Sequence, residues 1–391
     1  MKKFVKQLFI LSLVLILGAC SSSTSGGNDS SSEDSEDAIK VGLITAFSGA
    51  AAVYGPPVKN SAQLAINEIN EAGGLLGKEL VLFEADTATD PKTASDQAKA
   101  LSNNKKVDAL FAEVTSAERN AVLPVIEKSG QLFFYNAIYE GGEFSESMFI
   151  NGEVPNQQIS PVYPYIMKEF KGSKWFIIGE DYVWPKKTSE AVHKAVEEAD
   201  GEVVGEEYVP LGNSEYSSIL TKIKSAKPDF ISLQTNGPAA VAFMKQFKSM
   251  GLDKSTKVVA LAVDENSISA MGDAAEGLLL SAAYFTDMDT PENNKFKESY
   301  FNAFGEDAPK PNFITVPTYD AIHQWAKAVE AANSLDPDKV KEQLSKVTFT
   351  GPRGEVVYDQ KSQHAKLPIY LAEAQSDGTV KIINEFGSVE P

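Results

Sequence analysis

The chain has 391 residues and a formal net charge of −18, with 36 basic and 54 acidic side chains. A surface this acidic repels nucleic acid and anionic lipid headgroups, so we expect neither as a partner. The sequence contains one cysteine, so no disulfide can form within the chain and the fold must rest on its hydrophobic core.

Residues 1–20 have the charge order and length of a secretory signal. Lys2, Lys3 and Lys6 precede an apolar run at 8–17 that is too short for a stable transmembrane span. The run 17–20, Leu-Gly-Ala-Cys, resembles the bacterial lipobox, in which the Cys becomes the lipidated N-terminus of the mature protein. We therefore expect Cys20 to be lipidated, and the protein to be extracytoplasmic and anchored to the bacterial cell membrane by this lipid.

Residues 21–37 contain Ser, Gly, Asp and Glu but no large apolar side chain. Such a segment cannot offset its ordering entropy, so it is predicted to be a flexible tether.

From residue 38 onward, β-rich apolar runs alternate with helical patterns. The β-rich runs lie at 39–45, 80–84, 107–114, 132–135, 175–178, 203–209, 230–233, 258–263 and 278–284. The helical patterns lie at 58–69, 91–103, 117–129, 156–169, 188–199, 216–225, 239–250, 293–304 and 318–332. Alternation of this kind predicts an α/β fold with parallel sheets covered on both faces.

Residues 38–391 are more than one hydrophobic core usually serves, so we expect two doubly wound lobes. The first is predicted to comprise 38–154 and about 285–350, and the second 155–284 and about 351–391. Two such lobes facing each other place their strand ends, where open α/β sheets bind ligands, around one cleft.

The stretch 107–141 supplies the first candidate site residues. Ser116 follows a buried strand and is a natural N-cap for the next helix, whose N-terminus suits a carboxylate or carbonyl oxygen. Pro124 lies well inside that helix and predicts a kink or an early end. The next strand delivers Tyr135 and Tyr139 to the adjacent strand end. The alternative is an ordinary strand–helix–strand unit without a ligand.

The second half of the chain offers further candidates after its strands. Tyr182 and Trp184 are two residues apart, so they project the same way if that segment is extended. Asp264 and Glu265 follow the run at 258–263 and precede a short helix. Each aromatic residue alone is more often core filler, and each acid alone more often a helix cap. Together they favour a small polar ligand, which needs apolar walls and a few convergent polar groups.

The sequence lacks the usual marks of catalysis. It contains no Gly-x-Gly-x-x-Gly after a strand, no Gly-Lys-Ser/Thr loop, no His-Glu-x-x-His and no Gly-x-Ser-x-Gly. We therefore expect no cofactor, no metal site and no catalytic residues. An extracytoplasmic amidase, the enzymatic alternative, needs a nucleophile and a base that the sequence does not offer.

Patterns typical of one class of receptor occur at 43–49, 66–70, the Gly73-Gly74 loop and 86–90. On these segments the chain resembles type I periplasmic binding proteins, the solute receptors of ABC transporters, and the resemblance covers nearly all of residues 39–391. A closer likeness to the urea and short-chain amide receptors rests on 119–127, 139–141, 152–157, 179–185 and 208–211. The resemblance implies two lobes joined by three crossover strands, no catalysis, and a ligand clamped between the lobes.

Carried over by position, the pocket of the amide receptors falls on Ser116, Tyr135, Tyr182 and Trp184. The chain departs from them in three places. It has Val114 where they have a further Tyr, 136–138 reads Asn-Ala-Ile where they have Pro-Thr-Pro, and the position of Trp184 is commonly Tyr.

The resemblance implies a receptor for urea, a short-chain amide or a similar small polar solute, with an ABC permease as its partner. Ser116 would hold the carbonyl oxygen, the three aromatic residues would sandwich the flat face, and Asp264 or Glu265 would accept amide protons. One alternative is a receptor for branched-chain or other amino acids, with Asp264 or Glu265 holding the ammonium group. Another is a ligand sensor for a membrane kinase.

Overall fold

The computed structural model describes residues 37–391. The predicted signal peptide with Cys20, and all of the predicted tether except Asp37, lie outside the described residues. Within 37–391, no helix has the length and the apolar composition needed to cross a membrane.

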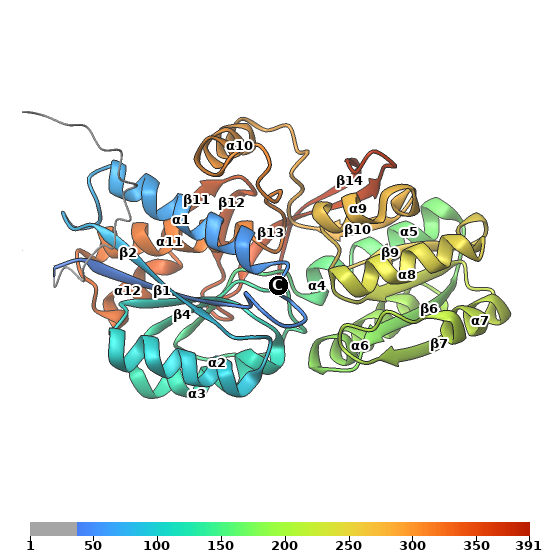
Figure 1. Cartoon of the computed structure of the whole chain (residues 1–391), viewed down its shortest axis with the longest axis horizontal. Coiled ribbons are helices and arrows are strands. Elements are labelled where there is room, and N and C mark those ends of the chain that lie inside the picture. The colour runs from blue at the N-terminus through green and yellow to red at the C-terminus, as the bar shows by residue number, and fades with distance from the viewer. Residues whose placement is uncertain (1–36) are drawn as a thin grey trace, which may run out of the picture. The chain divides into compact units, whose positions relative to one another are not determined.

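The strands of these residues form two sheets (Figure 1). The first sheet is parallel throughout and has the order β2-β1-β3-β4-β5. Its strands are β1 (Ile39–Thr45), β2 (Leu80–Asp86), β3 (Ala109–Glu113), β4 (Leu132–Tyr135) and β5 (Met148–Ile150).

The second sheet has a parallel part and an antiparallel part. The parallel part has the order β7-β6-β8-β9-β10, and β13 continues it antiparallel to β10. The parallel strands are β6 (Lys174–Glu180), β7 (Glu202–Val209), β8 (Phe230–Gln234), β9 (Lys257–Ala260) and β10 (Leu279–Ala282). The antiparallel strands are β11 (Phe349–Gly351), β12 (Gly354–Tyr358), β13 (Ala365–Ala374) and β14 (Val380–Val389).

Helices pack around both sheets. Those that follow strands of the first sheet or pack beside them are α1 (Gly55–Glu71), α2 (Pro91–Lys99), the π-helix η1 (Ala100–Lys105), α3 (Ser116–Ser129), α10 (Pro291–Phe304), α11 (Val316–Ala332) and α12 (Pro337–Leu344). The helices that lie between and beside the strands of the second sheet are α4 (Pro155–Gln158), α5 (Val162–Phe170), α6 (Val183–Glu198), α7 (Ser217–Ala226), α8 (Gly237–Ser249), η2 (Leu252–Lys254), α9 (Glu265–Met271) and η3 (Gly272–Ala275). In the first part, α1 packs beside α11 and α2 beside α3 (Figure 1).

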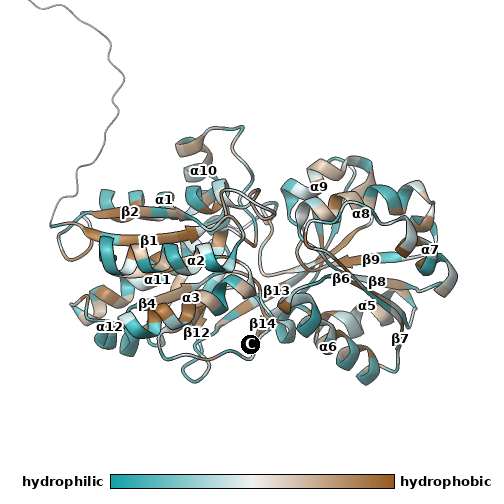
Figure 2. Cartoon of the chain, turned by 60° about the horizontal axis from the view of Figure 1, so that its bottom comes forward, coloured by the Kyte–Doolittle hydropathy of each residue, from teal (hydrophilic) through white to brown (hydrophobic). Residues whose placement is uncertain are grey.

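The strands carry the hydrophobic core. Every residue of β3, β4 and β8 is buried, because helices cover both faces of a parallel sheet and leave no solvated side. Figure 2 shows hydrophobic residues gathered on the strands and hydrophilic residues on the outer sides of the helices. The predicted α/β fold with two lobes of largely parallel sheet is therefore confirmed. The antiparallel strands β11–β14 were not predicted individually.

The chain passes between the two lobes three times. It leaves the first sheet after β5, returns to α10 and α11 after β10, and crosses again along β13. The start of β13 pairs with β12, whereas residues 370–373 of the same strand pair with β10. The lobes are thus joined by three segments of the chain rather than by a single linker.

Buried polar contacts hold this junction together. The Arg353 guanidinium donates from Nε to the Asp320 carboxylate of α11 at 2.6 Å and from Nη1 to the Asn151 carbonyl oxygen at 2.9 Å. Arg353 and Asp320 are fully buried, so each neutralises a charge that would otherwise be costly to bury.

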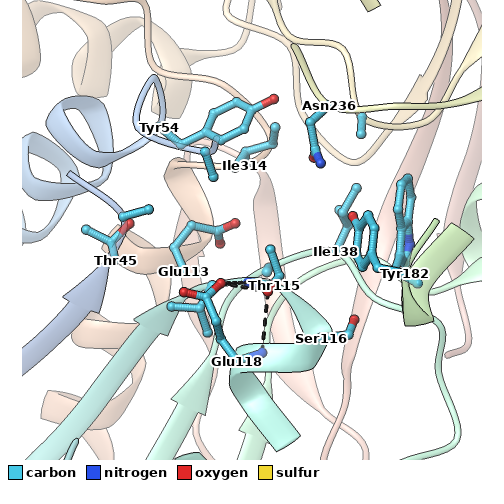
Figure 3. A pocket seen from close by; sticks show the side chains of 16 residues that line it. Thr45, Tyr54, Glu113, Thr115, Ser116, Glu118, Ile138, Tyr182, Asn236 and Ile314 are labelled. Carbon is cyan, nitrogen blue, oxygen red and sulfur yellow. Dashed lines mark hydrogen bonds between the residues drawn. The ribbon is translucent and has the colours of Figure 1, made fainter. Parts of the chain in front are cut away.

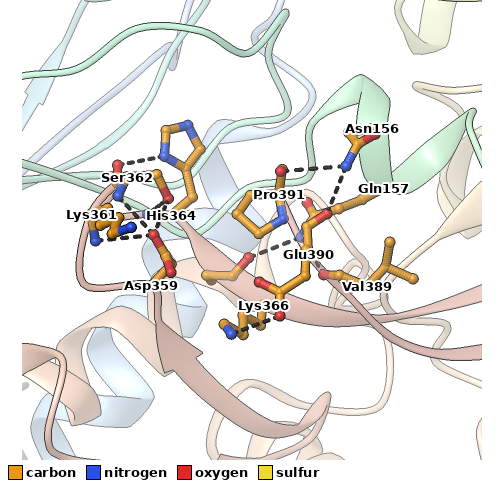
Figure 4. A network of polar contacts seen from close by, with 11 residues as sticks. Asn156, Gln157, Asp359, Lys361, Ser362, His364, Lys366, Val389, Glu390 and Pro391 are labelled. Atoms are coloured by element: carbon orange, nitrogen blue, oxygen red, sulfur yellow. Dashed lines mark hydrogen bonds and ion pairs between the residues drawn. The ribbon is translucent and has the colours of Figure 1, made fainter.

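The C-terminus is attached to α4. Asn156 donates to the carbonyl oxygens of Glu390 at 3.1 Å and Pro391 at 3.4 Å, and Gln157 donates to the Val389 carbonyl oxygen at 3.1 Å (Figure 4). Lys366 of β13 forms an ion pair with Glu390 at 2.7 Å. These bonds fix β14 and the short helix α4 at the junction of the lobes.

Two local expectations differ from the structure. Helix α3 does not end early at Pro124 but continues to Ser129, because packing holds the helix on either side of the one backbone bond that the proline removes. Tyr182 and Trp184 were expected to project the same way if their segment is extended, but α6 begins at Val183, so Trp184 lies in a helix. Pro185 lies in the first turn of that helix, where its missing N–H costs nothing.

Candidate ligand-binding site

A pocket lies where the switch points of both sheets face each other. In each sheet the strand order reverses at one point, between β1 and β3 and between β6 and β8, and ligands of open α/β sheets bind beyond such points. The pocket is lined by residues that follow these strands and by residues of nearby loops. They are Thr45, Ala46, Ala51, Tyr54, Glu113, Val114, Thr115, Ser116, Glu118, Ala137, Ile138, Tyr182, Trp184, Asn236, Ala262 and Ile314 (Figure 3).

The N-terminus of α3 forms the floor on the first-lobe side. The N-cap is Thr115 and not, as predicted, Ser116. Thr115 and Glu118 form a capping box, in which the Glu118 carboxylate accepts from the Thr115 N–H at 2.8 Å and from its hydroxyl at 2.6 Å. The capping box leaves other N–H groups of the first turn without intrahelical partners, next to the pocket.

Ser116 lines the pocket, as predicted, but its hydroxyl hydrogen is already used. It donates to the Glu140 carboxylate, whose other oxygen accepts from Arg119 at 2.8 Å. The Ser116 oxygen therefore presents lone pairs to the pocket, and in this arrangement it can accept an N–H from a ligand.

Tyr135 does not line the pocket and lies behind it. It is fully buried, and its hydroxyl donates to the Val114 carbonyl oxygen at 3.0 Å. The Arg119 guanidinium lies over the rings of Tyr135 and Tyr139, at 5.4 Å and 4.8 Å from the centroids. Tyr135 thus holds the end of β3 in place rather than contacting the cavity.

The second lobe contributes an aromatic wall and the N-terminus of α8. Tyr182 and Trp184 both line the pocket, with ring centroids 6.2 Å apart. Asn236, the N-cap of α8, faces the same space, and its backbone and side-chain N–H groups donate to Glu180 at 3.0 Å and 2.7 Å. Burial raises the pKa of the Glu180 carboxyl, while these bonds and one from the Gly212 N–H oppose the rise.

One hydrogen bond joins the two lobes directly across the pocket. The Tyr54 hydroxyl, ahead of α1, accepts from the backbone N–H of Gly237 at the start of α8, at 2.9 Å. Both groups are buried, and Tyr54 points across the pocket towards Asn236 in Figure 3. The bond can form only when the lobes are close together.

Asp264 and Glu265 were also predicted to contact the ligand, but the structure places both outside the pocket lining. Asp264 is the N-cap of α9, the role that an acid at such a position has more often than ligand binding. Its carboxylate accepts from the Ser267 N–H at 3.0 Å and from the Asn312 side chain at 2.7 Å. The Glu265 carboxylate accepts from the Thr286 N–H at 2.6 Å, and burial raises its pKa to about 8.

Glu113 lines the pocket but was not among the residues predicted from the sequence. It is the last residue of β3 and is 9% exposed. Its Oε2 has no hydrogen-bond partner within residues 37–391. An acid that ends an otherwise apolar strand, just ahead of a capped helix, was the signal available in the sequence.

The pocket is small. The space open to water-sized molecules is about 50 Å³. A single water needs roughly 10–15 Å³ on this measure, so the pocket has room for about four waters or one compact solute. Across the described part of the chain, no group of His, Cys, Asp and Glu is arranged to hold a metal ion.

A second cavity, of about 530 Å³, lies near the junction of the lobes. It is lined by residues 140–144 and 154–156, by Lys361, Ser362 and His364, and by Pro391. This cavity lies away from the strand ends at which the two sheets reverse their order.

The sequence of residues 38–379 matches the family model described as periplasmic binding protein. The chain belongs to the periplasmic binding protein family. The family implies an extracytoplasmic location and solute binding without catalysis, and the chain is a substrate-binding protein of the type I fold that ABC transporters use.

Two curated binding proteins illustrate the relationship. The leucine-, isoleucine-, valine-, threonine- and alanine-binding protein of Pseudomonas aeruginosa is 28% identical over 350 residues, which cover 88% of this chain and 91% of the relative. The Leu/Ile/Val-binding protein homolog 6 of Brucella melitensis is 28% identical over 352 residues, covering 88% and 90%.

Solved structures of binding proteins share the fold. A solute-binding protein of an ABC transporter from Rhodopseudomonas palustris BisB5, in complex with 3,4-dihydroxybenzoic acid, has a TM-score of 0.83 at 25% identity and covers 90% of this chain and 98% of its own. A leucine-binding protein from Thermotoga maritima has a TM-score of 0.79 at 22% identity, covering 90% and 99%.

Proposed function

We propose that this binding protein is the lipid-anchored receptor of an ABC importer for urea, a short-chain amide or a similar compact polar solute. The observation that carries the proposal is the size and chemistry of the pocket, which has about 50 Å³ of space and aromatic walls. The residues that line it, all among 37–391, include no Lys, Arg or His. An anion would therefore meet only neutral donors there, whereas a neutral solute needs no charged partner.

Each lobe supplies one part of the proposed contact. Free N–H groups of the first turn of α3 donate to the carbonyl oxygen of the solute, and the Ser116 oxygen accepts one of its N–H groups. Tyr182 and Trp184 cover the flat face, since an amide is planar and apolar above its plane. Tyr135, Asp264 and Glu265 are left out of this site because they do not line the pocket.

Binding would close the lobes. A solute that touches α3 on one side and Trp184 on the other has more contacts in the closed form, so it shifts the population towards closure. The buried bond between Tyr54 and Gly237 supports this proposal, because it can exist only in the closed form. The proposed lobes keep the boundaries at about 154 and 285 that were drawn from the sequence, 38–154 and 155–284. The third boundary, drawn at about 350, moves into β13, because β11 packs against α10 and α11 and pairs with β12.

Cys20 would tie the receptor to the membrane, next to the permease that takes over the solute. This part of the proposal rests on the lipobox-like run at 17–20.

An amino-acid receptor is the second candidate, because curated relatives carry the names of receptors for leucine, isoleucine and valine. The α-carboxylate would occupy the N-terminus of α3, which favours anions. The small pocket opposes this candidate, since leucine has more than twice as many non-hydrogen atoms as urea or acetamide.

A thermal-shift screen of the purified protein separates these candidates. We expect urea, acetamide or formamide to raise the melting temperature, because a ligand that binds only the folded state stabilises it by about 2.7 kcal/mol at a hundred times its Kd. Leucine and 3,4-dihydroxybenzoate should leave it unchanged. A shift with leucine and none with any amide would replace the proposal by the amino-acid receptor.

A further inference from the structure

Two buried carboxyl groups line the pocket, Glu113 and Glu118, and each has one oxygen without a hydrogen-bond partner in the described residues. The other oxygen of Glu118 is held by Thr115 in the capping box, whereas the proposed contacts leave Glu113 unused. It is more than nine-tenths buried, ends β3 at the switch point of the first sheet, and lines the cavity (Figure 3). Its Oε2 is buried without a hydrogen-bond partner in the described residues. A buried polar atom of this kind is costly unless something fills the space beside it and supplies a bond.

The surroundings of Glu113 favour a neutral carboxylic acid. Burial raises its pKa well above the usual range, and the charges of Glu153 and Glu118 add to the rise. The titratable groups on the elements around it are Glu118 of α3, Glu153 ahead of α4, Tyr135 of β4, and the pocket phenols of Tyr54 and Tyr182. The positive charge of Arg353 opposes the rise in the pKa of Glu153.

A neutral carboxylic acid is complementary to a primary amide. It offers one O–H donor and one carbonyl acceptor side by side, and the amide offers a carbonyl acceptor and an N–H donor at the same spacing. Two parallel hydrogen bonds can therefore form between them. Neither an ammonium group, which has no acceptor, nor a carboxylate, which has no donor, can make both bonds.

We propose that Glu113 determines the specificity of this pocket by binding, as a neutral acid, the –C(=O)–NH₂ group of the solute through two hydrogen bonds. Its O–H donates to the solute's carbonyl oxygen and its own carbonyl oxygen accepts a solute N–H. This inference rests on the proposed function and names the group that is recognised. Recognition by Glu113 would select primary amides and urea over amino acids, aromatic acids and amidines.

The role proposed for Glu113 fixes the direction in which the affinity for an amide changes with pH. The amide pairs with the protonated form of Glu113, so the affinity is constant at low pH and falls as pH rises through the pKa of Glu113 in the free protein. Far above that pKa the fall approaches tenfold per pH unit. An amidinium or ammonium solute, which pairs with the carboxylate, would show the opposite slope.

Three variants test the inference by calorimetric titration of urea and acetamide between pH 5 and pH 9. Glu113→Ala loses both bonds and should bind the solute about 5- to 100-fold more weakly at pH 5. Glu113→Gln keeps one donor and one acceptor but cannot ionise, so it should retain binding and lose the pH dependence. Glu265→Gln is the matched control, because it changes a buried acid outside the pocket and should leave both quantities unchanged.

The outcomes separate the inference from the proposed function. If wild-type protein binds neither urea nor any amide, the proposed function fails. If it binds an amide with the same affinity across the pH range and Glu113→Ala binds equally well, only the role of Glu113 is overturned. Tighter binding of acetamide as pH rises would also overturn it. Circular dichroism and melting curves of both Glu113 variants establish that they fold.

Discussion

The bond between the Tyr54 hydroxyl and the Gly237 N–H makes closure of the lobes open to a quantitative test. Gly237 is the first residue of α8, so its N–H has no partner within the helix. In the closed form Tyr54 satisfies it at 2.9 Å, away from solvent. In an open form water can take the place of the hydroxyl, so the bond contributes to the closed form alone.

Replacing Tyr54 by Phe removes the acceptor and keeps the ring. The Gly237 N–H is then buried without a partner on closure, which costs about 1–3 kcal/mol. At 1.4 kcal/mol per factor of ten, the Kd for a solute that closes the lobes should rise by about 5- to 140-fold. Calorimetric titration with the best solute from the screen measures this change.

Tyr300→Phe provides the matched control. The Tyr300 hydroxyl donates to the Pro309 carbonyl oxygen at 3.0 Å and accepts from Asn60 at 3.2 Å, and all three residues belong to the first lobe. This variant should melt at a lower temperature but bind the solute with unchanged Kd. A Kd for Tyr54→Phe within twofold of the wild type would refute the reasoning that closure drives binding.

Four further predictions concern single side chains. Ser116→Ala should weaken solute binding by about 0.5–3 kcal/mol, and an unchanged Kd would remove Ser116 from the site. Cys20→Ala should release the protein from membranes into the soluble fraction, and retention of the variant after high-salt washing would contradict the lipid anchor. Trp184, which is 2% exposed here, should account for most of the change in tryptophan emission on solute binding, so Trp184→Phe should remove most of that change. A variant that keeps the whole change would exclude Trp184 from the cleft. Burial raises the Glu265 pKa from 4.5 to about 8 in the folded state, so between these pH values the folded state holds a proton that the unfolded state has lost, and stability falls as pH rises. Glu265→Gln should therefore show a smaller drop in melting temperature from pH 5 to pH 8.5 than the wild type. An equal drop would contradict the shift.

The sequence predicted most of the strands because burial on both faces leaves an unmistakable pattern. Strands β1 and β4 begin and end at the predicted residues, since polar or turn-forming residues flank their apolar runs. Helix starts were harder. Thr115 is the cap of α3 because Glu118, three residues later, completes a capping box, and that spacing was present in the sequence. The start of α6 was missed because Pro185 suggests a loop and is equally at home in the first turn of a helix.

The pocket was predictable in its position and only partly in its composition. Ser116, Tyr182 and Trp184 follow strands that flank the switch points, and the structure brings them into one pocket. Asp264 and Glu265 also follow a strand, but the direction of a side chain at a helix start depends on packing. Asn312 and Thr286, distant in the sequence, bind these two acids and hold them away from the cavity. Glu113 reaches the pocket because it is the last residue of β3, a boundary that the apolar run 107–114 does not reveal.

A crystal structure of the protein in complex with the amide that stabilises it most would show directly where the solute binds. We expect one solute molecule between the lobes, in contact with Glu113 and Ser116 on one side and with Tyr182 and Trp184 on the other. The Tyr54 hydroxyl should be bonded to the Gly237 N–H in the same structure. A solute bound elsewhere, for example in the larger cavity beside His364, with the pocket between the switch points left to water, would contradict this expectation.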